Sequence, residues 1–533
     1  MRSLSESIGK PPIIVAKLVS KWRLVCLLSE ILALAYMGII IQPGYNESTR
    51  ISENALLPAL VTERFTSHQR ISAFLKGLHA TGNVAEYIKK QLQAYGIFTQ
   101  MLHFEATLPG FNNSGTNVLG VVRASRSSSV EAILMAVNMN DMEALAVAMA
   151  LATYCREQVY WARDIHFVFV DKGLVGMTAF LDEYHGHRHP FLRVEKLQFH
   201  SGAVVGGFAL KTTGTVFDTL NVEHNMMNGL LPNLDLLNLM IKLADKFGLV
   251  PEVFESAHQG SWWDLAELTS SAVLSQAFNE KEGLHSVFGS YGIQAVTIHA
   301  QNVFEGYVTL TDLARICEGA LRSLNNILEK FHQSYFLYIM TGTRRFLSVA
   351  YYMPALGFVL FPLFVLALRD WFSMIEFKFS NSFLLLHVIG IVEYCVIRSV
   401  ATSEEEVVSL RFLFYLDYCL IFGSLSLLNF SLALFISLIA VPLIILFTAV
   451  GISNRLINRS KAVFGFLLHP IALHLFCYYF LYNVVPTKAY VEQLVTDLIT
   501  NHLLFGSFLF PFIFICLLPL WNLLILISSS AFS

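Results

Sequence analysis

The chain has 533 residues, of which 55% are hydrophobic, and its mean hydropathy is +0.56. A soluble protein is less apolar than this, so the composition predicts segments that lie in lipid. The formal net charge of −3, with no Lys/Arg stripe interleaved with aromatic residues, argues against nucleic-acid binding.

The first predicted element is a hydrophobic helix over residues 24–41, close to the roughly 20 residues that span a bilayer. Residues 1–23 contain five basic residues and one acidic residue, so the positive-inside rule places them in the cytosol and the next segment in the lumen. A cleaved signal peptide is the alternative. The run is longer than an h-region of roughly 7–15 residues, and no A-x-A-like cleavage site follows it, so we expect a retained anchor.

Residues 42–345 have the pattern of a soluble α/β domain, in which short apolar runs alternate with helical spacing. The expected strands are Ile97–Phe104, Thr116–Val122, Glu131–Val137, Ile165–Val170, Ala203–Leu210 and Ile293–His299. The expected helices are Gln69–Tyr95 with a break at Gly82, Met142–Tyr154, Asn233–Phe247, and a long amphipathic helix from Thr309 that leads directly into the second membrane span.

Two sequons and two cysteines fall in this segment. Asn46 and Asn112 begin Asn-x-Ser sequons on the predicted lumenal side, and we expect them to be glycosylation sites. Cys155 and Cys317 lie in amphipathic helical patterns without a CxxC or histidine partner, which favours small buried hydrophobic side chains over a disulfide or a nucleophile.

Residues 346–533 have the pattern of a multispanning bundle. Candidate spans are Phe346–Leu368, Ser382–Val400, one or two within Val407–Val450, Ala462–Val485 and Leu503–Ile527. The acidic residues 404–406 and the basic residues 455–461 favour opposite sides of the membrane, and hence an odd number of crossings between them. The 44 residues from 407 to 450 are long enough for two, so we expect six to eight spans in total.

Several long strings resemble one family. They are SGTNVLG (114–120), VYWARDI (159–165), NGLLPNLDLLNL (228–239), LNNILEKFHQSYFLY (324–338) and YMPALGF (352–358). In this order they resemble the attachment subunit of the glycosylphosphatidylinositol (GPI) transamidase, and the order of elements resembles the zinc aminopeptidase fold. The expected architecture is therefore a zinc-aminopeptidase-like α/β lumenal domain plus an α-helical transmembrane bundle.

The metal site of that fold is absent from the sequence. A catalytic zinc needs three protein ligands and an open position. Asn138 and Asn140 stand where the resemblance implies a His and an Asp, Lys172 lies in the turn expected to hold a Glu pair, and Lys211 replaces a further Asp. Only His285 has a ligand counterpart. The domain is therefore expected to have lost its metal site, with no catalytic cofactor and no zinc.

The resemblance implies a non-catalytic subunit in the endoplasmic reticulum membrane that binds and presents the GPI lipid. The implied partners are the other transamidase subunits, including the cysteine-protease-like catalytic one, and precursor proteins with a C-terminal GPI signal. A metal-dependent peptidase or peptide synthetase is the alternative. A lipid transporter is a third reading, supported only by ionisable residues in the predicted spans, which are Glu30, Glu393, Arg398, Arg411 and Asp417.

The predicted lipid site combines two stretches that leave and re-enter the membrane. Arg50 and Ser52 follow the anchor, and His332, Gln333 and Ser334 precede the bundle. They offer the cationic, hydroxyl and polar groups that a phosphate and an ethanolamine amine need. The resemblance implies the same positions, with a magnesium ion at the phosphate near Gln333, although the family has an aromatic residue at the position of Arg50. The alternative is that Ser52 and Asn54 cap a turn and His332 snorkels.

Overall fold

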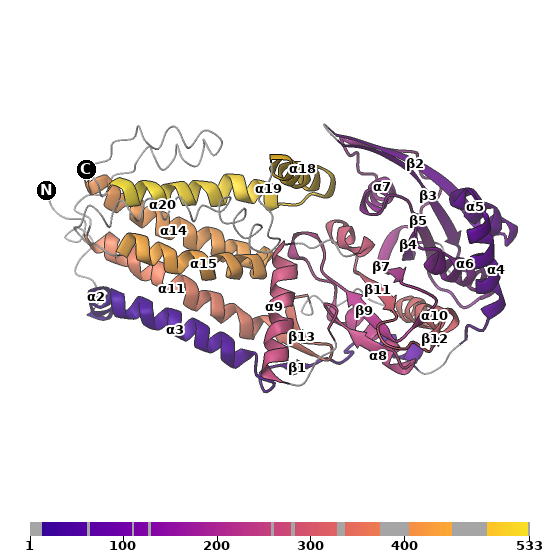
Figure 1. Ribbon diagram of the computed structural model, residues 1–533, viewed down its shortest axis with the longest axis horizontal. Coiled ribbons are helices and arrows are strands. Elements are labelled where there is room, and N and C mark those ends of the chain that lie inside the picture. Colours follow the sequence, from indigo (N-terminus) through magenta and orange to yellow (C-terminus); the bar gives the residue numbers. More distant parts are fainter. Residues whose placement is uncertain are drawn as a thin grey trace. The chain divides into compact units, whose positions relative to one another are not determined.

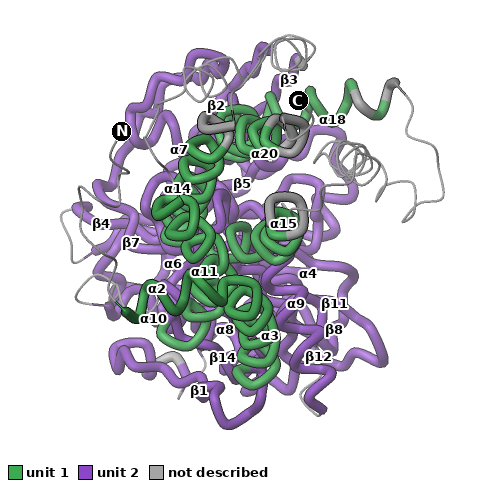
Figure 2. The backbone as a smooth tube through the Cα atoms, turned by 90° about the vertical axis from the view of Figure 1, so that its left-hand side faces the viewer, with its two compact units in different colours: residues 1–40, 350–502, 507–533 green, residues 41–349, 503–506 purple. Residues whose placement is uncertain are grey.

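The computed structural model divides the chain into two compact units, each described by itself (Figures 1 and 2). The globular unit comprises residues 41–349 and 503–506, and the helical unit comprises residues 1–40, 350–502 and 507–533. The α/β domain and the helical part that the sequence predicts are both present. The residues that the structure describes are 13–60, 64–108, 111–125, 129–256, 261–278, 283–327, 336–373, 404–449 and 488–530.

The globular unit is built on a nine-stranded mixed sheet with the order β10-β9-β11-β7-β4-β5-β3-β2-β6. The four central strands β11, β7, β4 and β5 are parallel, so their carboxyl ends lie at one edge of the sheet. The strand bounds are β2 Phe98–Leu108, β3 Phe111–Val122, β4 Glu131–Asn138, β5 Asp164–Val170, β6 Leu192–Val194, β7 Ala203–Thr212, β9 Thr219–Glu223, β10 Val250–Glu252 and β11 Ala295–Gln301.

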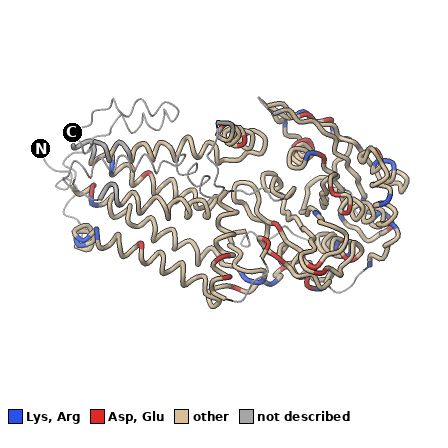
Figure 3. Tube along the Cα trace, in the orientation of Figure 1, with Lys and Arg blue, Asp and Glu red and all other residues tan. Residues whose placement is uncertain are grey.

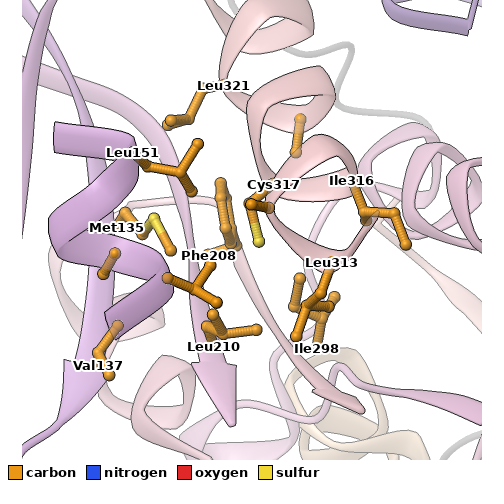
Figure 4. Close-up of a cluster of buried hydrophobic side chains, with 14 of the residues drawn as sticks. Met135, Val137, Leu151, Phe208, Leu210, Ile298, Leu313, Ile316, Cys317 and Leu321 are labelled. Carbon is orange, nitrogen blue, oxygen red and sulfur yellow. The ribbon is translucent and has the colours of Figure 1, made fainter. Parts of the chain in front are cut away.

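Strands β4 and β5 are mostly apolar and almost wholly buried because helices cover both faces of the sheet. Alternate residues of β4 enter different cores: Met135 joins the cluster beneath helices α6, α8 and α10, and Leu134 joins the cluster beneath α7 and the 3₁₀ segment η3. Figure 4 shows part of the first core, where Phe208 of β7 lies among side chains of the sheet and α10. The bounds are α6 Met142–Glu157, α7 Leu174–His185, α8 Leu234–Lys246, η3 Leu284–Tyr291 and α10 Leu310–Asn326.

Further helices complete the globular unit. They are η1 Asn54–Leu60, α4 His68–Ala80, α5 Val84–Ala94, η2 Met227–Gly229 and α9 Trp262–Phe278. Cys155 and Cys317 are both free thiols buried in the first core, as the sequence pattern predicted. Leu504 and Phe505, which lie far along the chain, are buried in the second core with residues of α7 and η3.

The expectation that the helix from Thr309 runs into the membrane is wrong. Helix α10 ends at Asn326, and a hairpin of β13 (Tyr338–Gly342) and β14 (Arg345–Ser348) precedes the next helix, which begins at Val349. The predicted span start at Phe346 therefore lies in a strand. The physical reason is that the apolar stripe of α10 packs into the core of the globular unit, where its Leu313 and Leu324 are buried. A two-stranded sheet of β8 (Val216–Phe217) and β12 (Val308–Thr309) lies beside its start.

The helical unit carries few charges along its helices, as Figure 3 shows. Three of its described helices are long and apolar enough to cross a membrane, and they are Trp22–Ile40, Val349–Ser373 and Val408–Leu428. The chain is accordingly a membrane protein. Two shorter apolar helices are Phe430–Ile445 and Leu509–Leu524. The predicted spans at 382–400 and 462–485 lie outside the described residues, so the total of six to eight stays a prediction. The bounds are α2 Ile13–Ser20, α3 Trp22–Ile40, α11 Val349–Ser373, α14 Glu404–Leu428, α15 Phe430–Ala449, α18 Lys488–Phe505, α19 Leu509–Pro511, the π-helical turn η6 Phe512–Leu517 and α20 Leu518–Ser530.

The region for which length favoured two spans does form two helices, α14 and α15, which pack against each other. They meet at Asn429, whose side-chain oxygen accepts a hydrogen bond from the backbone of Leu432 and so caps α15. Asp370 near the end of α11 pairs with Arg411 near the start of α14, at 3.2 Å. The end of α11 and the start of α14 therefore lie at the same end of the unit.

Candidate functional site

The globular unit has a cavity of about 420 Å³ at the carboxyl ends of the parallel strands, where α/β proteins commonly bind ligands. We call it the edge cavity. It contains most of the positions at which the resemblance implied metal ligands. The residues that line it are Asn138, Asn140, Asp141, Glu143, Gly173, Leu174, Ala209, Leu210, Lys211, Thr212, Gly283, Leu284 and Thr297.

The polar end of β4 is occupied by structural hydrogen bonds. The side-chain oxygen of Asn138 accepts a bond from the backbone of Asn140, at 3.0 Å. Asp141 caps α6 by accepting from Ala144, and it also accepts from the backbone and the hydroxyl of Thr212, both at 2.6 Å. Burial raises the pKa of Asp141 while these bonds oppose the shift. Asp141 therefore ties β4 and α6 to β7.

Lys211 has a carboxylate partner within the chain, which the sequence analysis missed. Its Nζ lies 3.5 Å from Oε1 of Glu223, a side chain that is 4% exposed at the end of β9. Burial raises the pKa of Glu223, and the charge of Lys211 opposes that rise. The signal in the sequence was an acidic residue, Glu223, that ends a short strand whose residues are all buried. Lys211, for which the resemblance implied a metal ligand, thus compensates the charge of a buried acid.

His285, the one position that matches a metal ligand, is fully buried in η3. Its Nδ1 lies 2.7 Å from the hydroxyl of Thr297, and its Nε2 has no hydrogen-bond partner. Burial, together with the neighbouring His224 ring, lowers the pKa of His285 to about 3, so the imidazole is neutral at pH 7.

The turn that should have carried a Glu pair is held by the SGTNVLG string. Asn117 of β3 accepts a hydrogen bond from the backbone of Asp171 and donates one to the carbonyl of Gly176. Asp171 accepts in turn from the backbone of Thr116, at 3.1 Å. These bonds fix the crossover from β5 to α7, whose Lys172 and Gly173 have positive φ angles of 57° and 58°. The string therefore has a structural role that the sequence alone did not reveal.

The edge cavity does not fit a catalytic zinc ion. Zinc requires three ligands from histidine, cysteine or carboxylate groups. The cavity offers amides, a lysine, the carboxylate of Asp141, which already accepts three hydrogen bonds, and the single further carboxylate of Glu143. Across the described ranges no three such side chains are arranged to hold a metal ion.

The second site is the stretch that follows the first span, which we call the post-anchor segment, residues 47–53. Its first two residues form β1 (Glu47–Ser48), which pairs with β14 in the three-stranded sheet β1-β14-β13. Ser48 lies opposite Arg345, and the backbone of Thr49 donates to the carbonyl of Arg344. Since β14 runs directly into α11, the segment lies beside the residues that precede a span.

Asp235 of α8 holds the centre of the post-anchor segment. Its carboxylate accepts bonds from the backbone and hydroxyl of Ser52, at 3.0 and 2.7 Å, and from the backbone of Glu53, at 3.1 Å. The side chain of Asn238, one turn further along α8, donates to the carbonyl of Arg50. The string NGLLPNLDLLNL, which contains both residues of α8, thus fixes the backbone of residues 50–53.

This arrangement turns Arg50 and Ser52 outward around the buried Ile51. The hydroxyl of Ser52 donates to Asp235, and no backbone N–H of the described residues donates to it, so it does not cap a turn as the alternative supposed. Instead the carboxylate of Glu53 accepts from the backbone of Ala55 at the start of η1. The predicted residues His332, Gln333 and Ser334 lie outside the described residues, and Tyr338 a few positions later donates to the carbonyl of Pro232.

The two predicted glycosylation sites have different surroundings. Asn112 is exposed in the β2–β3 hairpin. The side-chain nitrogen of Asn46 donates to the carbonyls of Ile41 and Gln42, and its oxygen accepts from Thr341. Asn46 therefore connects the end of the anchor to β13 through its side chain.

The comparisons with known proteins agree with the strings singled out above. The family described as "Gaa1-like, GPI transamidase component" matches residues 114–382 and 373–525. The chain belongs to this family. It is similar to the GPI transamidase component gaa1 of Schizosaccharomyces pombe, with 25% identity over 78% of this chain and 80% of that one. It is also similar to GAA1 of Saccharomyces cerevisiae, with 24% identity over 83% and 78% of the two chains.

Solved structures similar to part of this chain include two peptidases and a glutaminyl cyclase. A putative Zn-dependent exopeptidase from Bacteroides vulgatus aligns with a TM-score of 0.31 and 12% identity, over 49% of this chain and 98% of its own. A glutaminyl cyclase from Porphyromonas gingivalis aligns with a TM-score of 0.30 and 14% identity, over 49% and 98%. The LapA aminopeptidase of Legionella pneumophila aligns with a TM-score of 0.33 and 14% identity, over 53% and 75%.

Proposed function

We propose that this GPI transamidase component is a non-catalytic subunit that binds the GPI lipid and presents it for attachment to precursor proteins in the endoplasmic reticulum. In this proposal the globular unit is lumenal, and a cysteine-protease-like subunit of the complex cleaves the C-terminal GPI signal of the precursor. The observation that carries the proposal is the post-anchor segment, whose backbone is fixed by Asp235 while Arg50 and Ser52 face outward.

The chemistry of the segment suits an ethanolamine phosphate. The hydroxyl of Ser52 has one proton, which it donates to Asp235, so towards a ligand its oxygen can only accept. The ammonium group of a ligand can donate a hydrogen bond to this oxygen. Arg50, on the same side of the chain, presents guanidinium N–H groups that suit phosphate oxygens. One short segment thereby offers an acceptor for the amine and donors for the phosphate.

The position of the segment suits a lipid. It pairs with β14, and β14 leads into α11 at Val349, so it lies close in space to the start of a membrane-spanning helix. A lipid whose chains lie in the bilayer can place its head group only near such a boundary. The proposal also places the magnesium ion at the lipid phosphate, with the amide oxygen of Gln333 as a ligand, since hard cations of this kind bind oxygen donors.

The edge cavity supports the absence of catalysis. Asp141 binds Thr212, Lys211 binds Glu223, and His285 binds Thr297, so the polar groups at the position of an enzyme site hold the fold together. None of them forms a base beside a nucleophile or a set of zinc ligands. The reaction is therefore assigned to another subunit.

The test is capture of a photoreactive GPI analogue by the full chain in its complex. Ser52→Ala combined with Gln333→Ala should lower capture by about tenfold, the loss of one or two charge-assisted bonds, while the other subunits still co-purify. Ser270→Ala on α9 is the matched control, because its exposed hydroxyl bonds only to the carbonyl of Ala266 within its own helix. Unchanged capture by the double variant would refute the lipid site.

A further inference from the structure

Glu30 is an acidic residue in the middle of the first span whose carboxylate has no polar partner among the described residues. It is the ninth residue of α3, about 12 Å from the start of the helix and about 15 Å from its end at 1.5 Å per residue. Its Oε1 is buried and makes no hydrogen bond, and no described residue forms an ion pair with the carboxylate. An acidic residue at the centre of a span costs about 2.5–3.5 kcal/mol on insertion scales, so it requires an explanation.

The contacts of α3 with α11 do not use Glu30. Ser29 donates to the carbonyl of Phe358, at 2.7 Å, and Tyr36 donates to the carbonyl of Tyr351, at 2.8 Å. Cys26 makes a weaker contact with the carbonyl of Pro362. Three neighbouring side chains therefore attach α3 to α11, and the carboxylate of Glu30 contributes nothing to this packing that a leucine could not supply.

A second acid of the helical unit, Asp370, is neutralised by basic residues of the chain. Asp370 of α11 lies 2.7 Å from the guanidinium of Arg369 and 3.2 Å from that of Arg411 on α14. Asp370 shows that a buried acid in this unit can be neutralised by arginines of the same chain. Glu30 differs because the described chain offers it no cation.

The side of α3 that carries Glu30 also presents large apolar side chains outward. Leu27 and Leu34 lie three residues before and four residues after Glu30, on the same face, and they are 59% and 63% exposed. A second transmembrane helix could cover both leucines and bring a basic group to the carboxylate. Lys and Arg are equally costly in a span when alone, so a pair of opposite charges relieves both helices.

We propose that Glu30 is a docking point for a transmembrane helix of another subunit of the complex, which presents a lysine or arginine at mid-bilayer depth. Charge complementarity selects this occupant over lipid, because acyl chains carry no donor for a carboxylate. The inference rests on membership of a multi-component transamidase and not on GPI binding, so either can fail without the other.

The first test places a photoreactive amino acid at Leu27 or Leu34 in the full chain within the membrane-bound complex. Both probes should cross-link to a transmembrane segment of another subunit that contains a basic residue. A probe at Leu32, which is exposed on a different side of α3, is the control and should give at least about tenfold less of that product. Products only with lipid, or only with this chain's own helices, would overturn the inference.

The second test changes the charge. Glu30→Gln and Glu30→Leu should each lower that cross-link and the recovery of the partner subunit in detergent by about tenfold or more, and Glu30→Asp should lower them less. Once the partner residue is known, Glu30→Lys combined with its change to Glu should restore recovery. Wild-type recovery with Glu30→Gln would show that the charge is not used. Ser52→Ala with Gln333→Ala should leave the cross-link unchanged, which separates this contact from the lipid site.

Discussion

The edge cavity and the post-anchor segment use polar residues in opposite ways. In the cavity, Asp141 and Lys211 are bonded to other parts of the globular unit, and the buried His285 beside it is bonded to the lining residue Thr297. In the segment, Asp235 takes up the backbone donors, and the side chains of Arg50 and Ser52 remain on the surface. The cavity lies at the carboxyl ends of the parallel strands, and its Asp141 and Lys211 take part in structural contacts. The segment pairs with β14, and we propose that its exposed groups bind a ligand.

The difference shows why the location of a site in a fold does not establish its function. A carboxylate that accepts two or three internal hydrogen bonds is not available to a substrate. A hydroxyl whose proton is already donated is still available to a ligand that brings its own proton. The state of each donor and acceptor therefore distinguishes the two regions better than their depth in the protein.

The largest effect is expected when the carboxylate of Asp235, which fixes the backbone of the post-anchor segment, is removed. Asp235→Asn places an amide NH₂ group against the donors of Ser52 and Glu53, so at least one buried donor loses its acceptor. GPI-analogue capture should fall by at least about tenfold, and the backbone of residues 50–55 should exchange hydrogen faster. Asp245→Asn on the same helix is the control, since its partner Arg344 is an exposed side chain. Equal loss of capture in both variants would contradict the role given to Asp235.

The next effect tests whether His285, which is bonded to the cavity residue Thr297, is buried from solvent. Because His285 has a pKa of about 3 when folded and about 6.5 when unfolded, it contributes stability that is complete above pH 6.5 and is lost as the pH falls towards 3. At pH 5 the loss is about 2 kcal/mol. His285→Gln should remove that part of the pH dependence, as measured by hydrogen exchange in β11 of the full chain. An identical pH dependence in the variant would mean that His285 is accessible to protons in the folded state.

A smaller effect concerns the ion pair at the cavity. Lys211→Met leaves the buried carboxylate of Glu223 without its cation and should destabilise the globular unit by about 1–2 kcal/mol, discounted for the half-exposed lysine. Adding Glu223→Gln should recover most of this loss. GPI-analogue capture should stay within about twofold of wild type in both variants. A loss of capture with Lys211→Met at normal stability would move the lipid site to the cavity.

The two sequons give the smallest expected change in stability and a clear difference in modification. Asn112→Gln should shift the band in a glycosidase assay, because Asn112 is exposed on a hairpin. Asn46→Gln should not shift it, because the side-chain nitrogen of Asn46 is bonded to two carbonyls near the end of α3. A glycan at Asn46 would show that those bonds are not formed when the chain is modified. If neither site carries a glycan and proteases outside sealed microsomes digest residues 42–345, the lumenal orientation is wrong.

The sequence predicted the central strands of the sheet well because their apolar runs are continuous, as in β4 and β5. It missed α7, because apolar residues lie on nearly all sides of this helix and form no amphipathic stripe. It missed the role of Glu223, because an acid at the end of a short strand shows no sign of its partner twelve positions earlier. It extended α10 into the membrane because amphipathic spacing does not reveal which core buries the apolar face.

The candidate site was predictable only in part. Arg50 and Ser52 could be placed near a span from their distance to the anchor, whereas the contact with Asp235 joins residues more than 180 positions apart. No local pattern encodes such a contact. The resemblance places Asn138 and Lys211 at expected ligand positions, and their residue types then argue against zinc, because an amide and an ammonium group are poor zinc ligands in any fold.

The most direct test of the account is GPI attachment to a precursor by the purified complex carrying Asn138→Ala and Asn140→Ala, with the metal content of the wild-type chain measured alongside. We predict an attachment rate within about twofold of wild type and well under one zinc ion per chain, because the proposed function assigns no chemistry to the edge cavity. A loss of about 100-fold or more with the subunits still assembled, together with stoichiometric zinc, would contradict it and assign amide-bond formation to this chain.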